Sequence, residues 1–464
     1  MKLVNSKLKL KLNNSYLIIA IVLLLASFSI RIILFYPNWG ELRHSYASKY
    51  GSTAIGLYKG QGLTYNSSEV DSISHVKNNF SGNFLEFYNK KNREKFLVGL
   101  PGPPLILCLL WKLIPVNNFA PLIWLQILLD SILIFLFYSV FYKEDKKIFF
   151  IVTILMILNF PVIKRTLMVS YDFWPQFCIL VNFIGIAYSL KNKKNSVVLF
   201  ITGILTAFTI WCRSITNFLP FFITILLFFY FKYYNKIKLK LIIFKIVLYI
   251  LPVILSLCLL SSYRYYNTGN ARPTRTYFWH AFFAGVGQFS NPYNLKSKDA
   301  DIWNFGKKLN TEINKYSISE LSKSPNNIYE KTLKNKAKEF IKRYPHLFIR
   351  NVFYRIGIMI SPFLYKGGDF IPSSLFNILL PIGIVAFFLW FLGMYYLFKN
   401  QNLIFWLSAS IYFYFFAAFG WFYVVGRVIL PFLFINIFVY LFGIKFIITK
   451  LKEARLNAST HPKS

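Results

Sequence analysis

One carboxylate stands at the start of the first long polar stretch of the sequence. Glu41 lies in Tyr36-Pro-Asn-Trp-Gly-Glu-Leu-Arg-His44, a few residues beyond an apolar run that ends at Phe35. A carboxylate held near the end of a hydrophobic segment can act as a general base toward a hydroxyl or an amine. The alternative is an ordinary solvated loop acid, and position alone slightly favours that alternative.

Several arginines stand at the ends of apolar segments that the charge pattern described below assigns to one membrane face. They are Arg213, Arg264 and Arg427, with Arg272 and Arg275 shortly after Arg264. Guanidinium groups bind phosphate oxygens through pairs of parallel hydrogen bonds. Any single arginine could equally be an interfacial cation whose aliphatic stem lies along lipid. Three span-end arginines at one face favour an anionic ligand, such as a lipid-linked phosphate.

No metal or nucleotide site follows from the remaining residues. His75, His280 and His346 are scattered and lack a metal-ligand spacing, and the four cysteines lie in apolar stretches. The two glycines of Gly60-Gln-Gly62 indicate a turn, with no nucleotide-binding helix behind them. The sequence therefore predicts no cofactor, and a requirement for a divalent metal stays open.

The composition is that of a membrane protein. Hydrophobic residues make up 56% of the chain and charged residues 15%, whereas soluble domains carry about 25% charged residues. The net charge of +36 could indicate nucleic-acid binding. However, much of the lysine lies in clusters at the ends of apolar runs, and no nucleic-acid motif accompanies it. We therefore expect membrane lipids, and no nucleic acid, as partners.

Run lengths predict an all-α polytopic membrane protein with about ten transmembrane helices. About 20 apolar residues cross a bilayer, and the clearest runs of that length are 16–35, 122–142, 241–260 and 429–448. The first is too long for a cleaved signal peptide and is expected to remain as an anchor.

Basic clusters set the predicted topology. The tail 1–15 and the clusters Lys143–Lys147, Lys191–Lys194, Lys232–Lys240 and Lys450–Arg455 should all be cytoplasmic, because positive loops stay inside. Both termini are then cytoplasmic, in a multi-pass protein of a bacterial plasma membrane.

Two apolar pieces in the predicted outer segments are too short or too interrupted to cross. Pro101–Val116 opens with three prolines, and His346–Leu364 is interrupted by Arg350 and Arg355. We expect both to be interfacial helices. If Pro101–Val116 crossed, the later basic clusters would all face outward.

These assignments divide the chain into seven segments. They are a cytoplasmic basic tail (1–15), a first transmembrane helix (16–36), an outer-face loop with an interfacial helix (37–117), transmembrane helices two to seven (118–263), a second outer-face loop or lid with an interfacial helix (264–371), the last three transmembrane helices (372–450) and a cytoplasmic tail (451–464).

The order of these pieces resembles the membrane glycosyltransferases of the GT-C superfamily, and most closely the branch of the aminoarabinose transferases and protein O-mannosyltransferases. The likeness spans nearly the whole chain, and each motif is loose while their order is specific. The segments that carry it are the Pro-rich Leu100–Leu113, the Gly-rich Gly203–Arg213, Tyr263–Arg275, Lys338–Phe348 and Gly426–Pro431.

The resemblance implies an inverting hexosyl- or pentosyltransferase that moves a sugar from polyprenyl phosphate to a lipid, glycan or protein acceptor at the outer face. The arginines would stabilise the departing phosphate. In the family an acid stands roughly 14 residues before the Gly-x-Gly. Counted back from Gly60, that position is occupied here by Tyr46. Glu41 is the nearest upstream acid and the first choice for the base, and Asp71 and Glu69 rank second. Glu41, Arg213 and Arg427 should then lie within roughly 10–15 Å of one another.

Two other readings remain open. A transporter or flippase of a lipid-linked glycan would also use basic residues, but both long polar segments lie on one side and no internal repeat is visible. An O-antigen polymerase or ligase would share the topology and use two lipid-linked substrates. The sequence does not specify the sugar, the acceptor or the oligomeric state.

Overall fold

The computed structural model of this chain describes the residues 14–35, 47–76, 81–96, 100–169, 172–191, 196–234, 238–269, 271, 278–316, 327–364, 376–400, 402–420 and 429–460. Within them the regular structure is helical apart from one short ladder. That ladder pairs β1 (Thr64–Tyr65) with β2 (Glu94–Lys95) in antiparallel register.

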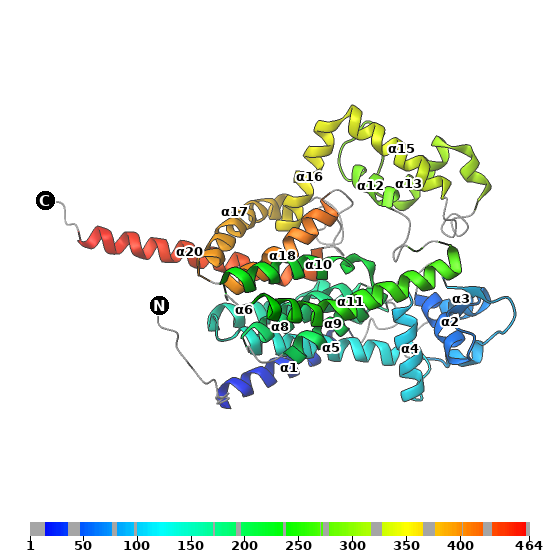
Figure 1. The fold of residues 1–464 in the computed structure, drawn as a ribbon, viewed down its shortest axis with the longest axis horizontal. Coiled ribbons are helices and arrows are strands. Elements are labelled where there is room, and N and C mark those ends of the chain that lie inside the picture. The colour runs from blue at the N-terminus through cyan, green and yellow to red at the C-terminus, as the bar shows by residue number, and fades with distance from the viewer. Residues whose placement is uncertain are drawn as a thin grey trace.

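Most of the long helices form one bundle that runs along the long axis of the molecule (Figure 1). Its helices are α1 (Asn14–Phe35), α5 (Ala120–Phe141), α6 (Lys146–Ile157), α7 (Phe160–Leu167), α8 (Phe173–Lys191), α9 (Ser196–Cys212), α10 (Leu219–Phe229), α11 (Leu239–Thr268), α17 (Phe376–Asn400), α18 (Asn402–Phe419) and α20 (Leu433–Thr460). Helix α8 is the most central, with nearly every side chain buried. The outward faces of the surrounding helices carry exposed aliphatic side chains such as Ile33 and Ile378.

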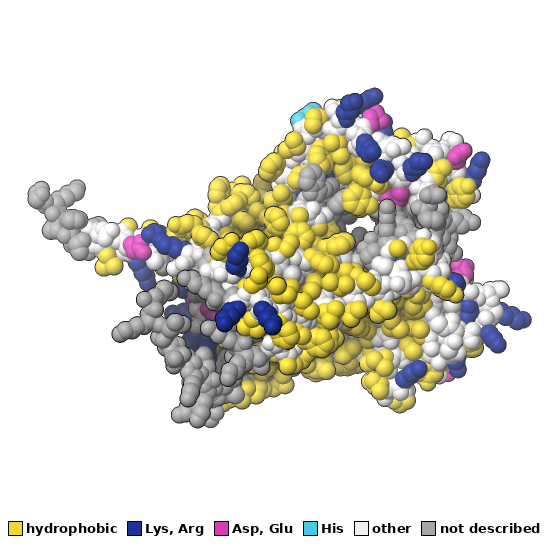
Figure 2. Space-filling view, in the orientation of Figure 1, with side chains coloured by type: hydrophobic (Ala, Val, Ile, Leu, Met, Phe, Trp, Pro, Cys, Tyr) yellow, Lys and Arg dark blue, Asp and Glu magenta, His cyan; other side chains and the backbone are white. Residues whose placement is uncertain are grey.

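Figure 2 shows hydrophobic side chains over the middle of this face and Lys and Arg gathered toward its two ends. A belt of this kind suits lipid contact, because hydrocarbon excludes charge. Six of the described helices are long and apolar enough to cross a membrane, four further apolar helices are shorter, and α6 with α7 forms a pair bent by 51°. The predicted all-α polytopic architecture is therefore confirmed, although helix length and composition do not fix the number of spans at ten.

The bend between α6 and α7 has a local cause. Asn159 caps α7, since its side chain accepts a hydrogen bond from the backbone N–H of Val162, and Pro161 occupies the first turn. Proline supplies no N–H to a preceding turn and is favoured at the start of a helix. The apolar run from Lys146 to Leu167 is therefore two short helices.

The first of two domains at one end of the bundle, which we call the first loop domain, comprises residues 47–113. It contains α2 (Ala47–Tyr58), α3 (Ser67–His75), the 3-10 turn η2 (Phe84–Phe87) and α4 (Gly102–Leu113) beside the small ladder. Helix α4 lies across the end of the bundle in Figure 1. At twelve residues it is roughly 18 Å long, which is shorter than the roughly 30 Å of a hydrocarbon core.

A second loop domain, residues 278–343, stands at the same end and folds around its own hydrophobic core. It comprises α12 (Phe278–Val286), α13 (Asp299–Leu309), η5 (Thr311–Lys315) and α15 (Ile328–Arg343), which bury Phe283, Tyr329 and Phe340. Helix α16 (Pro345–Ile360) and the short η6 (Pro362–Leu364) lead from this domain back to the bundle (Figure 1).

The helix that closes the chain is longer than the predicted last span. Helix α20 continues beyond residue 448 to Thr460, through good helix formers and a pair between Lys450 and Glu453. It ends at the pole of the bundle opposite the loop domains, where α1 also begins (Figure 1).

Candidate functional site

Four of the predicted site residues, Glu41, Arg272, Arg275 and Arg427, lie outside the described residues. The expected distance from Glu41 to Arg213 and Arg427 therefore stays a prediction. Among the described candidates are Arg213, Arg264, Asp71 and Glu69, and they fall into different surroundings.

Arg213 takes part in a cluster of two cations around one carboxylate. Its Nη2 lies 3.6 Å from Oδ1 of Asp172, and Nη1 of Arg165 lies 3.0 Å from Oδ2 of the same residue. The Asp172 side chain is 3% exposed, whereas the two arginine side chains are 22% and 17% exposed. The group of three charges therefore carries a net charge of +1 and is partly open.

This cluster lies at the end of the bundle that bears the loop domains. Arg213 directly follows α9, Asp172 directly precedes α8 and Arg165 is on α7. A Cβ on Gly102 at the start of α4 would meet Cys212 within 2.6 Å, which places the end of α9 against the first loop domain. Two guanidinium groups beside one buried carboxylate present a basic surface suited to phosphate oxygens.

Sequence reasoning assigned Arg213 to such a surface but missed Asp172 and Arg165. A signal was present, because an acid immediately before an apolar span is costly near lipid and is a default functional candidate. The chain has only 17 acidic residues, so each one at a span end is informative.

A second buried pair, also missed, lies inside the bundle next to this cluster. Nε of Arg31 on α1 donates to Oδ2 of Asp130 on α5 at 2.8 Å, and both side chains are essentially inaccessible to solvent. The same carboxylate accepts hydrogen bonds from Thr166 on α7 and Gln176 on α8, each at 3.2 Å. The carboxylate of Asp130 on α5 therefore links α5 to α1, α7 and α8.

The two second-choice acids on α3 differ from each other. Glu69 is fully buried, and its oxygens accept from the Arg93 guanidinium, the Ser52 hydroxyl and the backbone N–H of Asn89 at 2.8 Å. A carboxylate engaged in this way holds the first loop domain together and is poorly placed to accept a substrate proton. Asp71 on the same helix has an exposed side chain.

The Gly60-Gln-Gly62 segment ends α2 as a turn. Gly60 and Gly62 have φ of 74° and 70°, which are values that favour glycine, and the N–H of Gln61 caps the helix at the carbonyl of Gly56. The turn leads straight into β1, so its glycines serve chain reversal.

Arg264 is on α11, near the loop-domain end, and is 7% exposed. The structure thus places Arg213 and Arg264 at the same end of the bundle. Within the described part of the chain, no three His, Cys, Asp or Glu side chains come together in a way that could hold a metal ion.

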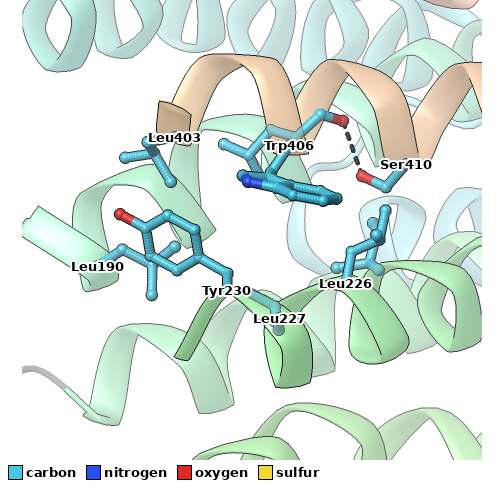
Figure 3. Close-up of a pocket in the computed structure, with 9 residues that line it drawn as sticks. Leu190, Leu226, Leu227, Tyr230, Leu403, Trp406 and Ser410 are labelled. Carbon is cyan, nitrogen blue, oxygen red and sulfur yellow. Dashed lines mark hydrogen bonds between the residues drawn. The ribbon is translucent and has the colours of Figure 1, made fainter. Parts of the chain in front are cut away.

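A small pocket elsewhere in the bundle has the wrong chemistry for such a site. Figure 3 shows it between α8, α10 and α18, with Leu190, Tyr230 and Trp406 among its walls. Its lining has no charged residue, and Leu190 lies at the end of α8 away from Asp172. We therefore place the candidate site at the loop-domain end.

No family model matches the sequence, and no curated protein matches it either. The solved structures do include a match, the archaeal oligosaccharyltransferase AglB from Archaeoglobus fulgidus in complex with an inhibitory peptide and a dolichol-phosphate. The TM-score is 0.50 at 12% sequence identity, and the match covers 96% of this chain and 52% of that chain. This chain therefore spans about half the length of that protein.

At such low identity the match shows the fold alone. The fold is GT-C-like, as the order of the sequence motifs predicts, and membership of the GT-C superfamily stays a prediction. The particular branch, that of the aminoarabinose transferases and protein O-mannosyltransferases, stays a prediction.

Proposed function

We propose that this chain is a membrane glycosyltransferase that moves a sugar from a polyprenyl-phosphate donor to a lipid, glycan or protein acceptor. The observation that carries the proposal is the GT-C-type fold over 96% of the chain, combined with a basic cluster at the end where the loop domains stand. The solved protein of the same fold holds a dolichol-phosphate and a peptide. A lipid phosphate is also the ligand that Arg165 and Arg213 suit best.

The proposed orientation places the loop domains outside and both termini in the cytoplasm of a bacterial plasma membrane. Basic residues support it, since Lys143, Lys146 and Lys191 all lie at the pole opposite the loop domains. The donor is then consumed at the outer face without a nucleotide.

In the proposed reaction, the acceptor loses its proton to the Glu41 carboxylate as its oxygen or nitrogen attacks the anomeric carbon. The bond between that carbon and the phosphate oxygen breaks, and polyprenyl phosphate leaves with the electron pair, so the configuration inverts. Arg213 and Arg165, both oriented by Asp172, stabilise the charge on the leaving phosphate. Arg264, Arg272, Arg275 and Arg427 are proposed to line the same phosphate path.

The test is transfer by the purified protein in liposomes. A panel of synthetic polyprenyl-phosphate sugars is supplied with envelope lipids, glycans and peptides, and donor loss and product formation are followed by mass spectrometry. Formation of polyprenyl phosphate together with a glycosylated acceptor supports the proposal. Movement of an intact lipid-linked glycan across the bilayer, with no bond cleavage, would instead support a flippase.

A further inference from the structure

Arg31 and Asp130 form a salt bridge buried within the bundle, with their side chains 0% and 1% exposed. The Asp130 carboxylate accepts from Nε of Arg31 at 2.8 Å, and Nη1 of Arg31 donates to the hydroxyl of Ser27 at 2.7 Å. Ser27 in turn lies 3.2 Å from Ser131. Charges in such a place are rarely kept for stability alone, since apolar side chains of equal volume often stabilise as well.

The contacts of Asp130 lead directly to the basic cluster. Thr166, which donates to Asp130 at 3.2 Å, is the neighbour of Arg165 on α7. Gln176, which donates at 3.2 Å, is in the first turn of α8, four residues after Asp172. Each hydrogen bond therefore fixes the segment that presents one member of the cluster.

The partner of Asp130 leads to the remaining piece of the proposed site. Arg31 stands one turn before the end of α1 at Phe35, and the chain then enters the segment that contains Glu41. One carboxylate is thus tied to the helix before the proposed base and to both helices that flank the proposed phosphate cluster. Arg31 on α1 and Arg165 of the phosphate cluster are 134 residues apart in sequence.

We infer that Asp130 is a positioning residue, which sets the Arg165–Asp172–Arg213 cluster in register with the end of α1. The inference rests on the proposed function for its consequence in catalysis, although the geometry it describes can be tested without that function. Misplacement of reacting groups by about 1 Å costs roughly a hundredfold in rate. A change at Asp130 that displaces the cluster should therefore lower the rate of sugar transfer.

The decisive variant removes both charges together, as Arg31→Met with Asp130→Leu. No lone charge is left buried, so the protein should fold and melt near the wild-type temperature. We expect transfer to fall about a hundredfold, with a smaller loss of polyprenyl-phosphate binding, because the cluster persists but is misplaced. Wild-type transfer in this folded double variant would overturn the inference.

A second variant covers the case in which the double variant does not fold. Thr166→Val with Gln176→Leu keeps the ion pair and removes the links from Asp130 to α7 and α8, together with the contact of the Thr166 hydroxyl with the Val162 carbonyl within α7. The same loss of transfer is expected. The matched control is Tyr412→Phe, which removes a buried hydrogen bond to Asn436 between α18 and α20. It should lower the melting temperature without changing transfer.

A distance measurement separates this inference from the proposed function. Spin labels at Lys164→Cys on α7 and Phe218→Cys, just after Arg213, report the spacing of the two arginine-bearing segments. Both residues are exposed, and Cys258→Ser removes the exposed native cysteine.

The distance distribution should shift or broaden in the charge-free and Thr166/Gln176 double variants and stay as in the wild type in Tyr412→Phe. An unchanged distribution in both double variants would overturn the positioning role. If the wild type transfers no sugar at all, the proposed function fails, and this measurement still decides the role of Asp130.

Discussion

Arg355 and Gly420 are joined across the junction between the second loop domain and the bundle. Nη1 of Arg355 on α16 donates to the carbonyl oxygen of Gly420, at the end of α18, at 3.1 Å. Its Nη2 donates to the carbonyl of Gly285 at the end of α12. Among the described residues no carboxylate pairs with this guanidinium, which is 2% exposed. Its Nε also donates to Oε1 of Gln288 at 3.4 Å, so one arginine links the second loop domain to the bundle mainly through backbone oxygens.

Arg355→Met should loosen this junction. Burial lowers the pKa of the Arg355 guanidinium to about 10, so it is still charged at neutral pH and its hydrogen bonds are charge-assisted. The variant leaves the Gly420 carbonyl without its donor, a loss of about 1–3 kcal/mol. It also removes the charge-assisted bond to Gly285, whose carbonyl still accepts from the backbone N–H of Gln288 at 3.3 Å. Limited proteolysis should cleave within 278–343 several-fold faster than in the wild type.

Arg355→Lys is the matched control for this change. An ammonium keeps the charge but cannot present the planar fork that reaches both carbonyls. It should be cleaved nearly as fast as the methionine variant. Wild-type resistance in the lysine variant would mean that charge alone holds the junction.

Glu41→Gln should abolish transfer and leave donor binding nearly intact. The amide keeps the size and the hydrogen-bonding groups of the carboxylate but is not basic, and loss of a general base typically costs about 10²–10⁴-fold in rate. Single-turnover transfer and polyprenyl-phosphate binding are measured side by side. Asp71→Asn is made in parallel, and if it and not Glu41→Gln stops transfer, the base lies on α3.

Arg213→Ala should weaken donor binding and transfer together, because the proposed contact with phosphate would exist in both the bound and the leaving state. Arg213→Lys keeps the charge and should restore only part of the loss, since a lysine cannot bind phosphate through two parallel bonds. Binding of polyprenyl phosphate and of the neutral polyprenol is compared by titration. An equal effect on both lipids would show that Arg213 does not recognise phosphate.

The local features of the fold could be predicted from sequence, because each depends on a continuous run of residues. The apolar runs 16–35 and 122–142 agree with the bounds of α1 and α5 to within a few residues. The turn at Gly60-Gln-Gly62 is likewise encoded by two glycines at positive φ. Neither feature requires knowledge of a distant residue.

The site could be predicted only in part, because its pairings join distant residues. Arg31 and Asp130 are 99 residues apart, and no local pattern marks them as partners. Glu69 has the sequence surroundings of a solvated loop acid, yet Arg93 and Ser52 fold over it. The position of Arg213 at the end of an apolar segment could be predicted because it is a local feature, whereas the contacts of Asp172 with Arg165 and Arg213 join different parts of the chain.

Membrane topology can be tested by labelling single cysteines in the Cys258→Ser background. Ser74→Cys in the first loop domain and Asn335→Cys in the second are at exposed positions, as is Lys143→Cys at the opposite pole. A membrane-impermeant maleimide added to intact cells should label the first two and spare the third until the cells are opened. Labelling at residue 143 in intact cells would reverse the orientation and remove the outer-face site.

Asp145 links the start of α6 to α20, and its contribution should depend on pH. Its carboxylate accepts from the N–H of Ile148 at 3.0 Å and from Lys445, 300 residues away, at 2.6 Å. Burial alone would raise the pKa of Asp145, but the backbone N–H groups and the Lys445 ammonium outweigh it and hold the pKa below its ordinary 3.8. The folded state therefore favours the ionised form.

Asp145→Asn should lower the stability at pH 7 by up to about 1 kcal/mol, because the amide still caps α6 but no longer forms the ion pair with Lys445. Because the pKa is lower in the folded chain than in the unfolded one, this contribution is complete above the unfolded value and is lost as the pH falls through the folded value. Thermal unfolding in detergent should show different melting temperatures for Asp145→Asn and the wild type at pH 7, and the two should converge below about pH 4.

Two lysine variants serve as comparisons. Lys445→Met should lose the same pH-dependent part of the stability, whereas Lys450→Met, whose partner Glu453 is exposed, should lose almost nothing. A constant gap between Asp145→Asn and the wild type down to the lowest pH would mean that the side chain acts by shape and hydrogen bonding without its charge.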